Sequence, residues 1–309
     1  MFFNASLYAI MKFQGDSIMK KVKKAIITDA GFASRYLPIT KTIPKAMVPI
    51  GAKPVMQLCV EECVEAGIEE IIIVATPNTK SKEIYEDYFH NKSDNVRTLL
   101  EKQGKLDRFK PVEQVLSFPK ITVIEQDPSL PYGNGSPIVS AKEFVKDEEA
   151  FVVLYSDDLI LGQGDAKILI DSYEKNPETK AVIAAQEMPE DAWHKYGMIA
   201  LKDNGTLSHI VEKPKTPDLS PSNLTSYGRY LLTPEVFDYL LPSNTGLDGE
   251  LWTVDAITEL AKHGDVIVTK SSGEWITTGD PKNYFLAHLK YVLTKTDYAD
   301  DVRKFIAEN

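Results

Sequence analysis

Short runs of β-branched and aliphatic residues alternate with segments of helical spacing through the first half of the chain. Strands are expected in "KKAIITDA", "EEIIIVAT", "KITVIEQ" and "AFVVLYSDD", at residues 23–30, 69–76, 120–126 and 150–158. Helices are expected in "PVMQLCVEECVEAG", "SKEIYEDYF" and "IVSAKEFV", at residues 54–67, 81–89 and 138–145. This alternation is typical of βαβ units, which build a largely parallel sheet with helices on both faces.

The pattern changes after residue 180. Further strand-like runs joined by turns follow at residues 181–188, 197–201, 207–213 and 225–232. Helices are then expected at residues 249–264 and 281–295, and a charged helical excursion is expected earlier, at residues 96–109. The predicted fold class is therefore α/β: a Rossmann-like mixed, largely parallel sheet flanked by helices, with a small antiparallel β elaboration and C-terminal helices.

A single domain is expected over residues 19–309, because no repeat, long linker or low-complexity segment interrupts this stretch. Within it we distinguish three parts, at residues 19–179, 180–273 and 274–309. Residues 1–18 lack the basic start and the long apolar centre of a signal peptide, and "MKKVKKAIITDAG" from Met19 resembles a natural start. Residues 1–18 are thus expected to be a disordered tail or the product of a mis-set start codon.

Composition narrows the possible classes of function. The chain of 309 residues is 43% hydrophobic and has a formal net charge of -10, with 35 Lys and Arg against 45 Asp and Glu. Membrane insertion is not expected, since no apolar run approaches the roughly 20 residues that a membrane helix needs. The acidic balance also argues against non-specific nucleic-acid binding, which depends on many phosphate contacts by Lys and Arg. Any anionic ligand must then be met by a local cluster of positive charge.

Cys59 and Cys63 are the two cysteines of the sequence, and they are four apart in a predicted helix, where disulfide geometry is unfavourable. They indicate a reducing, cytoplasmic setting. The five histidines are scattered along the chain. Buried apolar cysteines are therefore favoured, and a metal site is the alternative.

The segment at residues 30–60 breaks the acidic trend, because it carries Arg35, Lys41, Lys45 and Lys53 but no Asp or Glu. Its prolines stiffen the path between the first predicted strand and the first predicted helix, a common place for phosphate to meet backbone N–H groups. We expect this loop to hold a polyanion, and a merely solvated surface loop is the alternative. Neither G-x-x-x-x-G-K-[ST] nor G-x-G-x-x-G follows the first strand, which disfavours a P-loop kinase and a dinucleotide dehydrogenase.

Two adjacent carboxylates end the strand-like run at residues 150–158. Asp157 and Asp158 are hard oxygen ligands of the kind that bind Mg²⁺ shared with substrate phosphates, and a solvated turn is the alternative. Two other stretches have similarly open interpretations. "PYGNGSP" is either a ligand-binding turn or an ordinary glycine turn, and "VEKP" offers either a ligand-binding carboxylate and cation or a surface ion pair.

Motifs spread along the chain resemble those of one family. "AGFASRYLPITKTIPKAMVPIGAKP" resembles the signature A-G-x-G-T-R-x-L-P-x-T-K-x-x-P-K-x-M-x-P of the bacterial-type UTP:glucose-1-phosphate uridylyltransferases, or UDP-glucose pyrophosphorylases, within the sugar nucleotidyltransferases. Its later motifs are similar, in the right order, to "YSDDLIL", "YGMIAL", "VEKPK", "SNLTSYGRYLLTPEVF", "GELWTVDAI" and "GDPKNYFLAHLKYVL". The helical excursion is similar to an insertion of the uridylyltransferases. The resemblance covers almost the whole chain after residue 20.

The resemblance implies Mg²⁺-assisted transfer of a uridylyl group from UTP to glucose 1-phosphate, with in-line attack at the α-phosphorus and release of pyrophosphate. A phosphate monoester is already anionic near neutral pH, so no His or Ser base is required. Catalysis would then consist mostly of positioning and charge neutralisation. Residues 19–179 become the nucleotide-binding part, residues 180–273 the sugar-binding part and residues 274–309 the C-terminal helices.

The resemblance also implies a role for individual residues. Arg35 would contact the leaving phosphates and Lys45 the α-phosphate, while Asp157 would be the ligand of the Mg²⁺ cofactor. The expected catalytic residues are Arg35, Lys45 and Lys213. The expected nucleotide-binding residues are Ala30, Gly31, Gln126, Gly133 and Gly135. The expected sugar-phosphate-binding residues are Gly197, Glu212 and Lys213.

The chain departs from the family pattern at several positions. Ala33 stands where the family has a second loop glycine, and alanine is costly there if the backbone needs a positive φ. Thr277 replaces an Asp that serves as a second metal contact in related enzymes, which leaves Asp280 as a substitute. Asn134 and Ser136 differ from the family residues of the glycine turn. Two alternatives therefore stay open: the same fold with another nucleoside triphosphate or sugar 1-phosphate, and a non-catalytic, nucleotide-sugar-binding regulatory subunit.

The expected partners are UTP and glucose 1-phosphate, and the family resemblance adds a homo-oligomer. Nucleic acid and membrane are not expected as partners.

Overall fold

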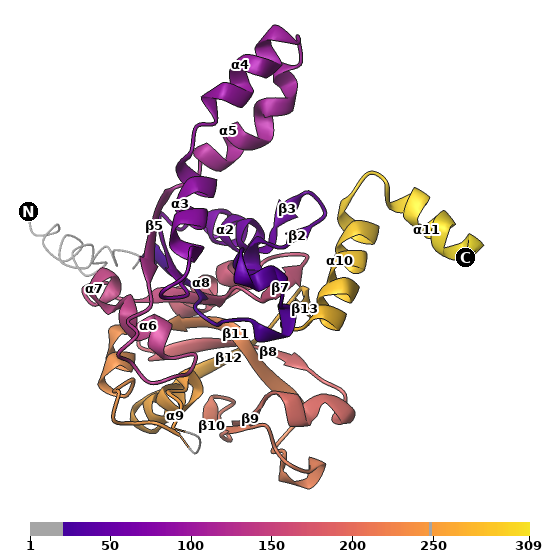
Figure 1. Cartoon of the computed structure of the whole chain (residues 1–309). Helices are drawn as coiled ribbons and strands as arrows, with labels where there is room; N and C mark the ends of the chain where they lie inside the picture. The colour runs from indigo at the N-terminus through magenta and orange to yellow at the C-terminus, as the bar shows by residue number, and fades with distance from the viewer. Residues whose placement is uncertain (1–20, 247–248) are drawn as a thin grey trace, which may run out of the picture.

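A nine-stranded mixed sheet runs through the centre of the computed structural model, which describes residues 21–246 and 249–309 (Figure 1). Its parallel core consists of the neighbouring strands β6 (Phe151–Tyr155), β1 (Lys24–Asp29), β4 (Glu70–Ala75) and β5 (Lys120–Glu125). All four strands expected in the first half of the chain are thus present, and they are parallel to one another. The tail expected at residues 1–18 lies outside the described residues.

The strands of the second half join the same sheet. β11 (Leu224–Leu232) is antiparallel to its neighbours β6, β8 (Ala181–Glu187) and β9 (Gly197–Leu201). β10 (Leu207–Glu212) extends the sheet beyond β9, and β12 (Val266–Lys270) pairs in parallel with β8. The predicted mixed sheet with an antiparallel elaboration is therefore confirmed.

Helices cover both faces of the sheet because successive side chains of each buried strand point to opposite sides. On β1, Ala25 and Ile27 belong to one apolar cluster, whereas Ile26 belongs to the other. The first face is covered by α2 (Val55–Glu65), α3 (Ser81–His90) and α8 (Asp165–Lys175). The second face is covered by α6 (Ser136–Ser140), α7 (Lys142–Val145) and α9 (Thr253–His263). Both faces of the sheet are therefore buried under apolar side chains, as a central parallel sheet requires.

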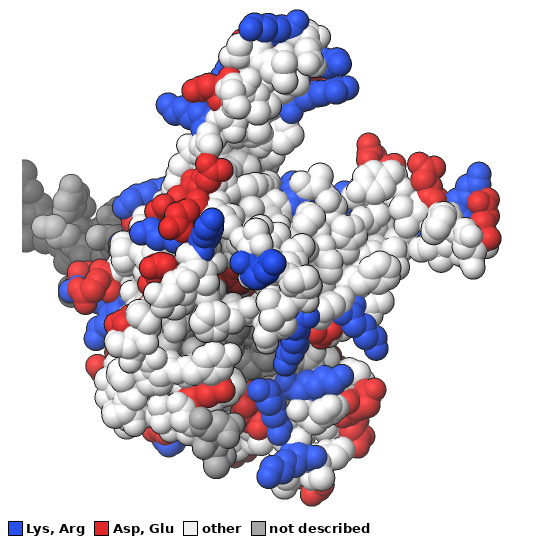
Figure 2. Space-filling model, viewed as in Figure 1, with Lys and Arg blue, Asp and Glu red and all other residues white. Residues whose placement is uncertain are grey.

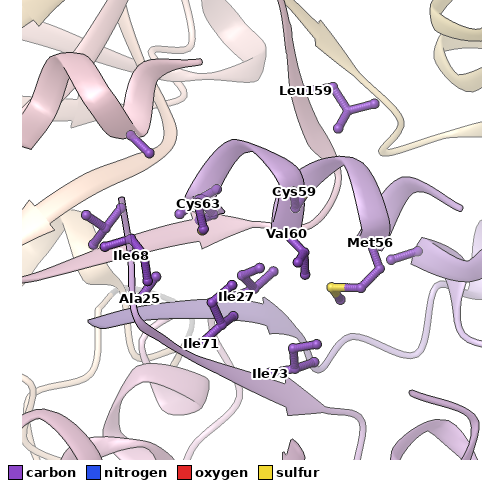
Figure 3. Close-up of a cluster of buried hydrophobic side chains, with 14 of the residues drawn as sticks. Ala25, Ile27, Met56, Cys59, Val60, Cys63, Ile68, Ile71, Ile73 and Leu159 are labelled. Atoms are coloured by element: carbon purple, nitrogen blue, oxygen red, sulfur yellow. The ribbon is translucent and has the colours of Figure 1, made fainter. Parts of the chain in front are cut away.

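Both cysteines lie on the sheet-facing side of α2. Figure 3 shows Cys59 and Cys63 on the helix above Ala25, Ile27 and Ile71 of the neighbouring strands. Both thiols are free and buried, and burial raises their pKa, in the case of Cys59 to about 12. The expectation of buried apolar cysteines is confirmed.

Some elements differ from the expected pattern. The single helix expected at residues 138–145 is two short helices, α6 and α7, with a break at Ala141. Near that break, Ser140 Oγ donates to the carbonyl oxygen of Ser136 at 2.8 Å, a contact that bends helices. Seven helices and strands were not anticipated: β2 (Pro49–Ile50), β3 (Lys53–Pro54), β7 (Asp158–Leu161), α8, β12, β13 (Glu274–Thr277) and α11 (Ala299–Glu308).

Two helical projections leave the body of the molecule (Figure 1). One consists of α4 (Asp94–Lys102) and α5 (Lys110–Leu116) and extends beyond the charged excursion expected at residues 96–109. The other is α10 (Pro281–Lys295) followed by α11. On the face drawn in Figure 2, Lys and Arg stand out along the first projection and beside the loops near β9 and β10. Within the described residues, no helix is both long enough and apolar enough to cross a membrane.

Candidate active site

A cleft of about 360 Å³ opens where the parallel strands β1 and β6 end. The carboxyl ends of neighbouring parallel strands meet at one edge of the sheet, which is where open α/β sheets bind ligands. The cleft brings together six of the residues predicted from the sequence. These are Ala30, Gly31, Lys45, Gln126, Gly133 and Asp157.

The turn after β6 separates its two carboxylates by environment. Asp158 is buried, with one oxygen accepting from Trp275 Nε1 at 2.7 Å and the other from the Gly228 N–H at 3.1 Å. Burial, together with the charge of Asp157, raises the pKa of Asp158 to about 6. Asp157 instead lines the cleft, and its side chain is 34% exposed. The solvated-turn alternative therefore does not fit Asp158, and Asp157 is the one of the two that a ligand can reach.

Lys45 is the cationic partner of Asp157. The two side chains meet with Nζ and Oδ2 2.8 Å apart, although the residues are 112 positions apart in the sequence. Burial disfavours the ammonium, yet Asp157 and the nearby Asp29 raise the pKa of Lys45 above its ordinary value. Conversely, burial opposes ionisation of Asp157, but Lys45 holds its pKa below the ordinary value. Both groups are thus charged at neutral pH, and they face the same cavity.

The other cations of the loop lie elsewhere. Arg35 is exposed in a short 3-10 turn, Ser34–Tyr36, and Lys41 is exposed in the next one. Lys53 Nζ lies 2.8 Å from both carboxylate oxygens of Glu61 on α2. Of the four positive residues predicted to hold a polyanion, Lys45 is therefore the one that lines the cleft.

Ala33 has the positive φ that a family glycine would supply. Its φ and ψ are 45° and 46°, in the left-handed region that non-glycine residues adopt at a cost. The expectation that this backbone is unfavourable for alanine is confirmed. The loop keeps this shape without a glycine at that position, and Thr40 Oγ1 donates to the Ala33 carbonyl at 3.0 Å.

The glycine turn before α6 is tied to the segment that leads into α9. Gly133 has a φ of +133°, and a Cβ added there would lie 2.3 Å from the carbonyl oxygen of Leu251. The Gly135 N–H donates to the same carbonyl at 2.9 Å, so Gly135 packs against Leu251. Asn134 Oδ1 accepts from the Thr253 N–H at 2.8 Å and thereby caps the start of α9. Gly133 and Asn134 line the cleft, whereas Gly135 supports the turn from behind.

The residues expected for the sugar phosphate form a second group at the end of the β9–β10 pair. Gly197 and Glu212 are register partners, and a Cβ on Gly197 would come within 2.8 Å of Glu212 Oε2. Lys213 follows with a φ of 45°, and its Nζ lies 3.6 Å from Glu212 Oε1 and 4.9 Å from the centre of the Trp252 ring. Trp252 itself lines the cleft, so it connects this group to the cleft.

The segment after β13 lies beside Asp157. Thr278 donates to the Asp157 carbonyl through its N–H at 2.6 Å and its hydroxyl at 3.1 Å. A Cβ added to Gly279 would lie 3.6 Å from Asp157 Oδ2. Thr277 Oγ1 accepts from the Gly279 N–H at 3.2 Å, and Asp280 caps α10 by accepting from the Asn283 N–H at 3.0 Å. Thr277 and Asp280 are thus engaged in local structure next to the metal candidate.

Two residues of this region, Trp252 and Arg229, were not predicted from the sequence. Trp252 carried no signal, since nothing in its local pattern distinguishes it from a core residue before a helix. Arg229 did carry one, because a cation in the middle of an otherwise apolar strand is unusual. It forms a buried ion pair with Glu62 of α2, with Nη2 and Oε2 2.9 Å apart.

The Gly133 contact makes a testable prediction. Gly133→Ala should lower the free energy of unfolding by about 1–3 kcal/mol through backbone strain, and by about 1–3 kcal/mol more through the clash with Leu251. Gly205→Ala is the matched control, because Gly205 also has a positive φ, +82°, but open space around its Cβ position. Urea unfolding of both variants measures the difference. Equal losses would show that the close approach to Leu251 is unimportant.

Comparison with known proteins identifies the family. Residues 24–293 match the model of the nucleotidyl transferase family. The UTP–glucose-1-phosphate uridylyltransferase 2 of Staphylococcus saprophyticus is 38% identical over 293 residues, which cover 93% of this chain and 98% of the relative. A UTP–glucose-1-phosphate uridylyltransferase of Staphylococcus epidermidis is 37% identical over 295 residues, which cover 94% and 99% of the two chains.

Solved structures agree with this assignment. A UTP-bound UDP-glucose pyrophosphorylase from Acinetobacter baumannii superimposes with a TM-score of 0.82 at 30% identity, covering 93% of this chain and 99% of the other. A UDP-glucose pyrophosphorylase complexed with UDP-glucose gives a TM-score of 0.75 at 30% identity, with coverages of 88% and 98%. The chain therefore belongs to the nucleotidyl transferase family, among the UTP–glucose-1-phosphate uridylyltransferases.

Proposed function

We propose that the protein transfers a uridylyl group from UTP to glucose 1-phosphate and releases UDP-glucose and pyrophosphate. The observation that carries the proposal is the pair formed by Lys45 and Asp157 in the cleft where β1 and β6 end. A cation and a carboxylate side by side are what a phosphate group with its bound Mg²⁺ requires, because each finds a partner of opposite charge. The relatives named above support the choice of UTP and glucose 1-phosphate.

The donor set of the cleft fits Mg²⁺ that is held mainly through the substrate. Within residues 21–246 and 249–309, no three His, Cys, Asp or Glu side chains gather to hold an ion by themselves. Mg²⁺ is commonly bound by one or two protein carboxylates together with phosphate oxygens and water. Asp157 faces the cleft, whereas internal donors engage Asp158 and Asp29. We therefore assign Asp157 as the protein ligand.

The chain's own residues position two anions and neutralise their charge. Lys45 would leave Asp157 to contact the α-phosphate, and Arg35 would contact the outer phosphates from the solvent side of the same loop. Mg²⁺, when bound, supplies further charge neutralisation and orientation of the transferred group. The nucleophile needs no general base, since a phosphate monoester, with a second pKa of about 6, is mostly doubly ionised at neutral pH. Positioning and electrostatics thus supply most of the rate acceleration.

The base and the sugar would occupy opposite ends of the site. The base would lie against Gly31, Gln126 and the turn at Gly133, where an amide side chain offers both a donor and an acceptor to a pyrimidine edge. The glucose hydroxyls would bond to Glu212, and Lys213 would bind the sugar phosphate. Gly197 leaves room for the Glu212 side chain, because a Cβ at position 197 would lie 2.8 Å from Glu212 Oε2. The side-chain oxygen of Asn134 accepts a hydrogen bond at the start of α9. The difference between Asn134 and the family residue therefore does not by itself indicate that the enzyme binds a base other than uracil.

A substrate matrix tests the activity. Pyrophosphate release is measured with Mg²⁺ across several nucleoside triphosphates and sugar 1-phosphates. Turnover that is best with UTP and glucose 1-phosphate supports the proposal. A different best pair would show that the fold serves another nucleotide sugar, and tight binding without turnover would identify a regulatory subunit.

Asp157→Asn should lower kcat by at least about tenfold, because the neutral amide is a poor Mg²⁺ ligand and leaves Lys45 without its carboxylate. The matched control is Asp300→Asn on α11, where the carboxylate is 97% exposed and far along the chain from the cleft. Steady-state kinetics at saturating UTP measure the effect. An unchanged kcat in Asp157→Asn would remove this residue from the metal role.

We further propose a cytoplasmic location and self-association. The free, buried thiols of Cys59 and Cys63 suit a reducing compartment.

Large apolar side chains exposed on the C-terminal helices support an interface between copies. Examples are Phe285 and Leu286 on α10, and Phe305 and Ile306 on α11. Light scattering decides the second point, since the mass of one chain at micromolar concentration would contradict it.

A further inference from the structure

A fully buried cation lies behind the turn that carries Asp157. Arg229 is on β11, whose nine residues are all buried, and its side chain has no exposed surface. Burying a charge is costly unless every hydrogen-bonding group of the side chain finds a partner. The mechanism proposed above assigns Arg229 no role, although it is among the largest fully buried side chains.

Each nitrogen of the Arg229 guanidinium donates to oxygen. Nε donates to both oxygens of Glu62, at 3.1 and 3.2 Å, and Nη2 donates to Glu62 Oε2 at 2.9 Å and to the Asp158 carbonyl. Nη1 donates to the carbonyl oxygens of Tyr155, at 3.1 Å, and Gly228, at 2.8 Å. A guanidinium has five N–H donors in a fixed plane, so these contacts can engage all of them.

Two of these carbonyls flank the Asp157 turn. Tyr155 is the last residue of β6 and Asp158 the first of β7, so Arg229 grips both ends of the two-residue connection that contains Asp157. The opposite side of the turn is held as well. Thr278 donates to the Asp157 carbonyl, and the Ser156 N–H donates to the carbonyl oxygen of Thr28 at 3.1 Å. The backbone of the turn is thereby fixed, and the Asp157 carboxylate faces the cleft.

Glu62 holds the guanidinium in place from the other side. It comes from α2, and its Oε1 also accepts from the Ala166 N–H at 3.1 Å in the first turn of α8. Gly164 makes room for it, since a Cβ there would lie 2.6 Å from Glu62 Cγ. The orientation of Arg229 is therefore set by two helices that pack on the sheet, and not by the flexible edge of the site.

We propose that Arg229 is a positioning residue for the transfer reaction, which orients Asp157 toward the bound nucleotide by holding the Tyr155 and Asp158 carbonyls with one rigid guanidinium. The inference rests on the proposed function, because it concerns the role given to Asp157 there. It assigns the buried Glu62–Arg229 pair a task in the geometry of the site in addition to its contribution to stability. A purely structural role would affect folding without separating kcat from KM or changing the effect of Mg²⁺ on UTP binding.

The test is Arg229→Lys. Lysine keeps the charge but offers three donors from one point, so it cannot span Glu62 and both flanking carbonyls. We expect kcat to fall at least about tenfold, while KM for glucose 1-phosphate changes by less than about threefold. Calorimetric titration of UTP with and without Mg²⁺ is the readout independent of turnover. The wild type should gain affinity on adding Mg²⁺, and the variant should lose most of that gain.

Two further variants separate positioning from stability. Val145→Ala removes buried methyl groups from α7, on the face of the sheet opposite α2, and does not touch the Asp157 turn; it should lower stability and change kcat by less than about threefold. Arg303→Lys on the exposed helix α11 is the matched control for the substitution itself. Should Arg229→Lys fail to fold, the double variant Glu62→Leu with Arg229→Met carries the same test, since it leaves no unpaired charge.

The outcomes are distinct. An inactive wild type would overturn the proposed function, whatever the variants do. An active wild type, with an Arg229→Lys variant that keeps its kcat and its Mg²⁺-dependent gain in UTP affinity, would overturn the positioning role alone. Loss of kcat in strict proportion to loss of stability, in both Arg229→Lys and Val145→Ala, would also overturn it, because only a structural role predicts that relation.

Discussion

The ion pair between Lys45 and Asp157 is the contact on which the site depends. It joins the loop after β1 to the turn after β6, and the two residues are 112 positions apart in the sequence. Without a ligand, the carboxylate neutralises a cation that burial would otherwise discharge, and the cation keeps the carboxylate ionised. The cleft is therefore electrostatically prepared: the groups that a charged substrate needs are present and ionised, and they stabilise each other until it arrives.

This pair can exist because the sheet brings the two segments together. β1 and β6 are parallel neighbours, so the chain leaves both of them at the same edge. Apolar side chains on both faces fix the register of these strands, and the polar residues that follow them cannot slide past one another. Behind the turn, Arg229 and Glu62 carry the constraint from the sheet into α2 and α8. The buried layers thus fix the place at which the turn with Asp157 leaves the sheet.

The sequence predicted those parts of the molecule that local pattern controls. The four parallel strands follow from their buried, β-branched runs, and the positive φ of Ala33 follows from a motif that requires glycine. α8 is predictable from local pattern as well, since Ala166, Leu169, Ile170 and Tyr173 have helical spacing. Local sequence could not predict which residue Gly135 contacts, and its assignment to the nucleotide stays a prediction. Its partner, Leu251, lies more than a hundred positions downstream, and only the folded chain shows that the Gly135 N–H donates to the Leu251 carbonyl.

The link between the glycine turn and α9 has a consequence for how substrate preference can change. Gly133 and Asn134 touch the chain just before and at the start of α9, and Trp252, between these contacts, lies against Lys213. The two ends of the site therefore share one piece of backbone. In the binding mode proposed above, a substitution that displaces the segment from Leu251 to Thr253 would therefore act on the base end and the sugar end together.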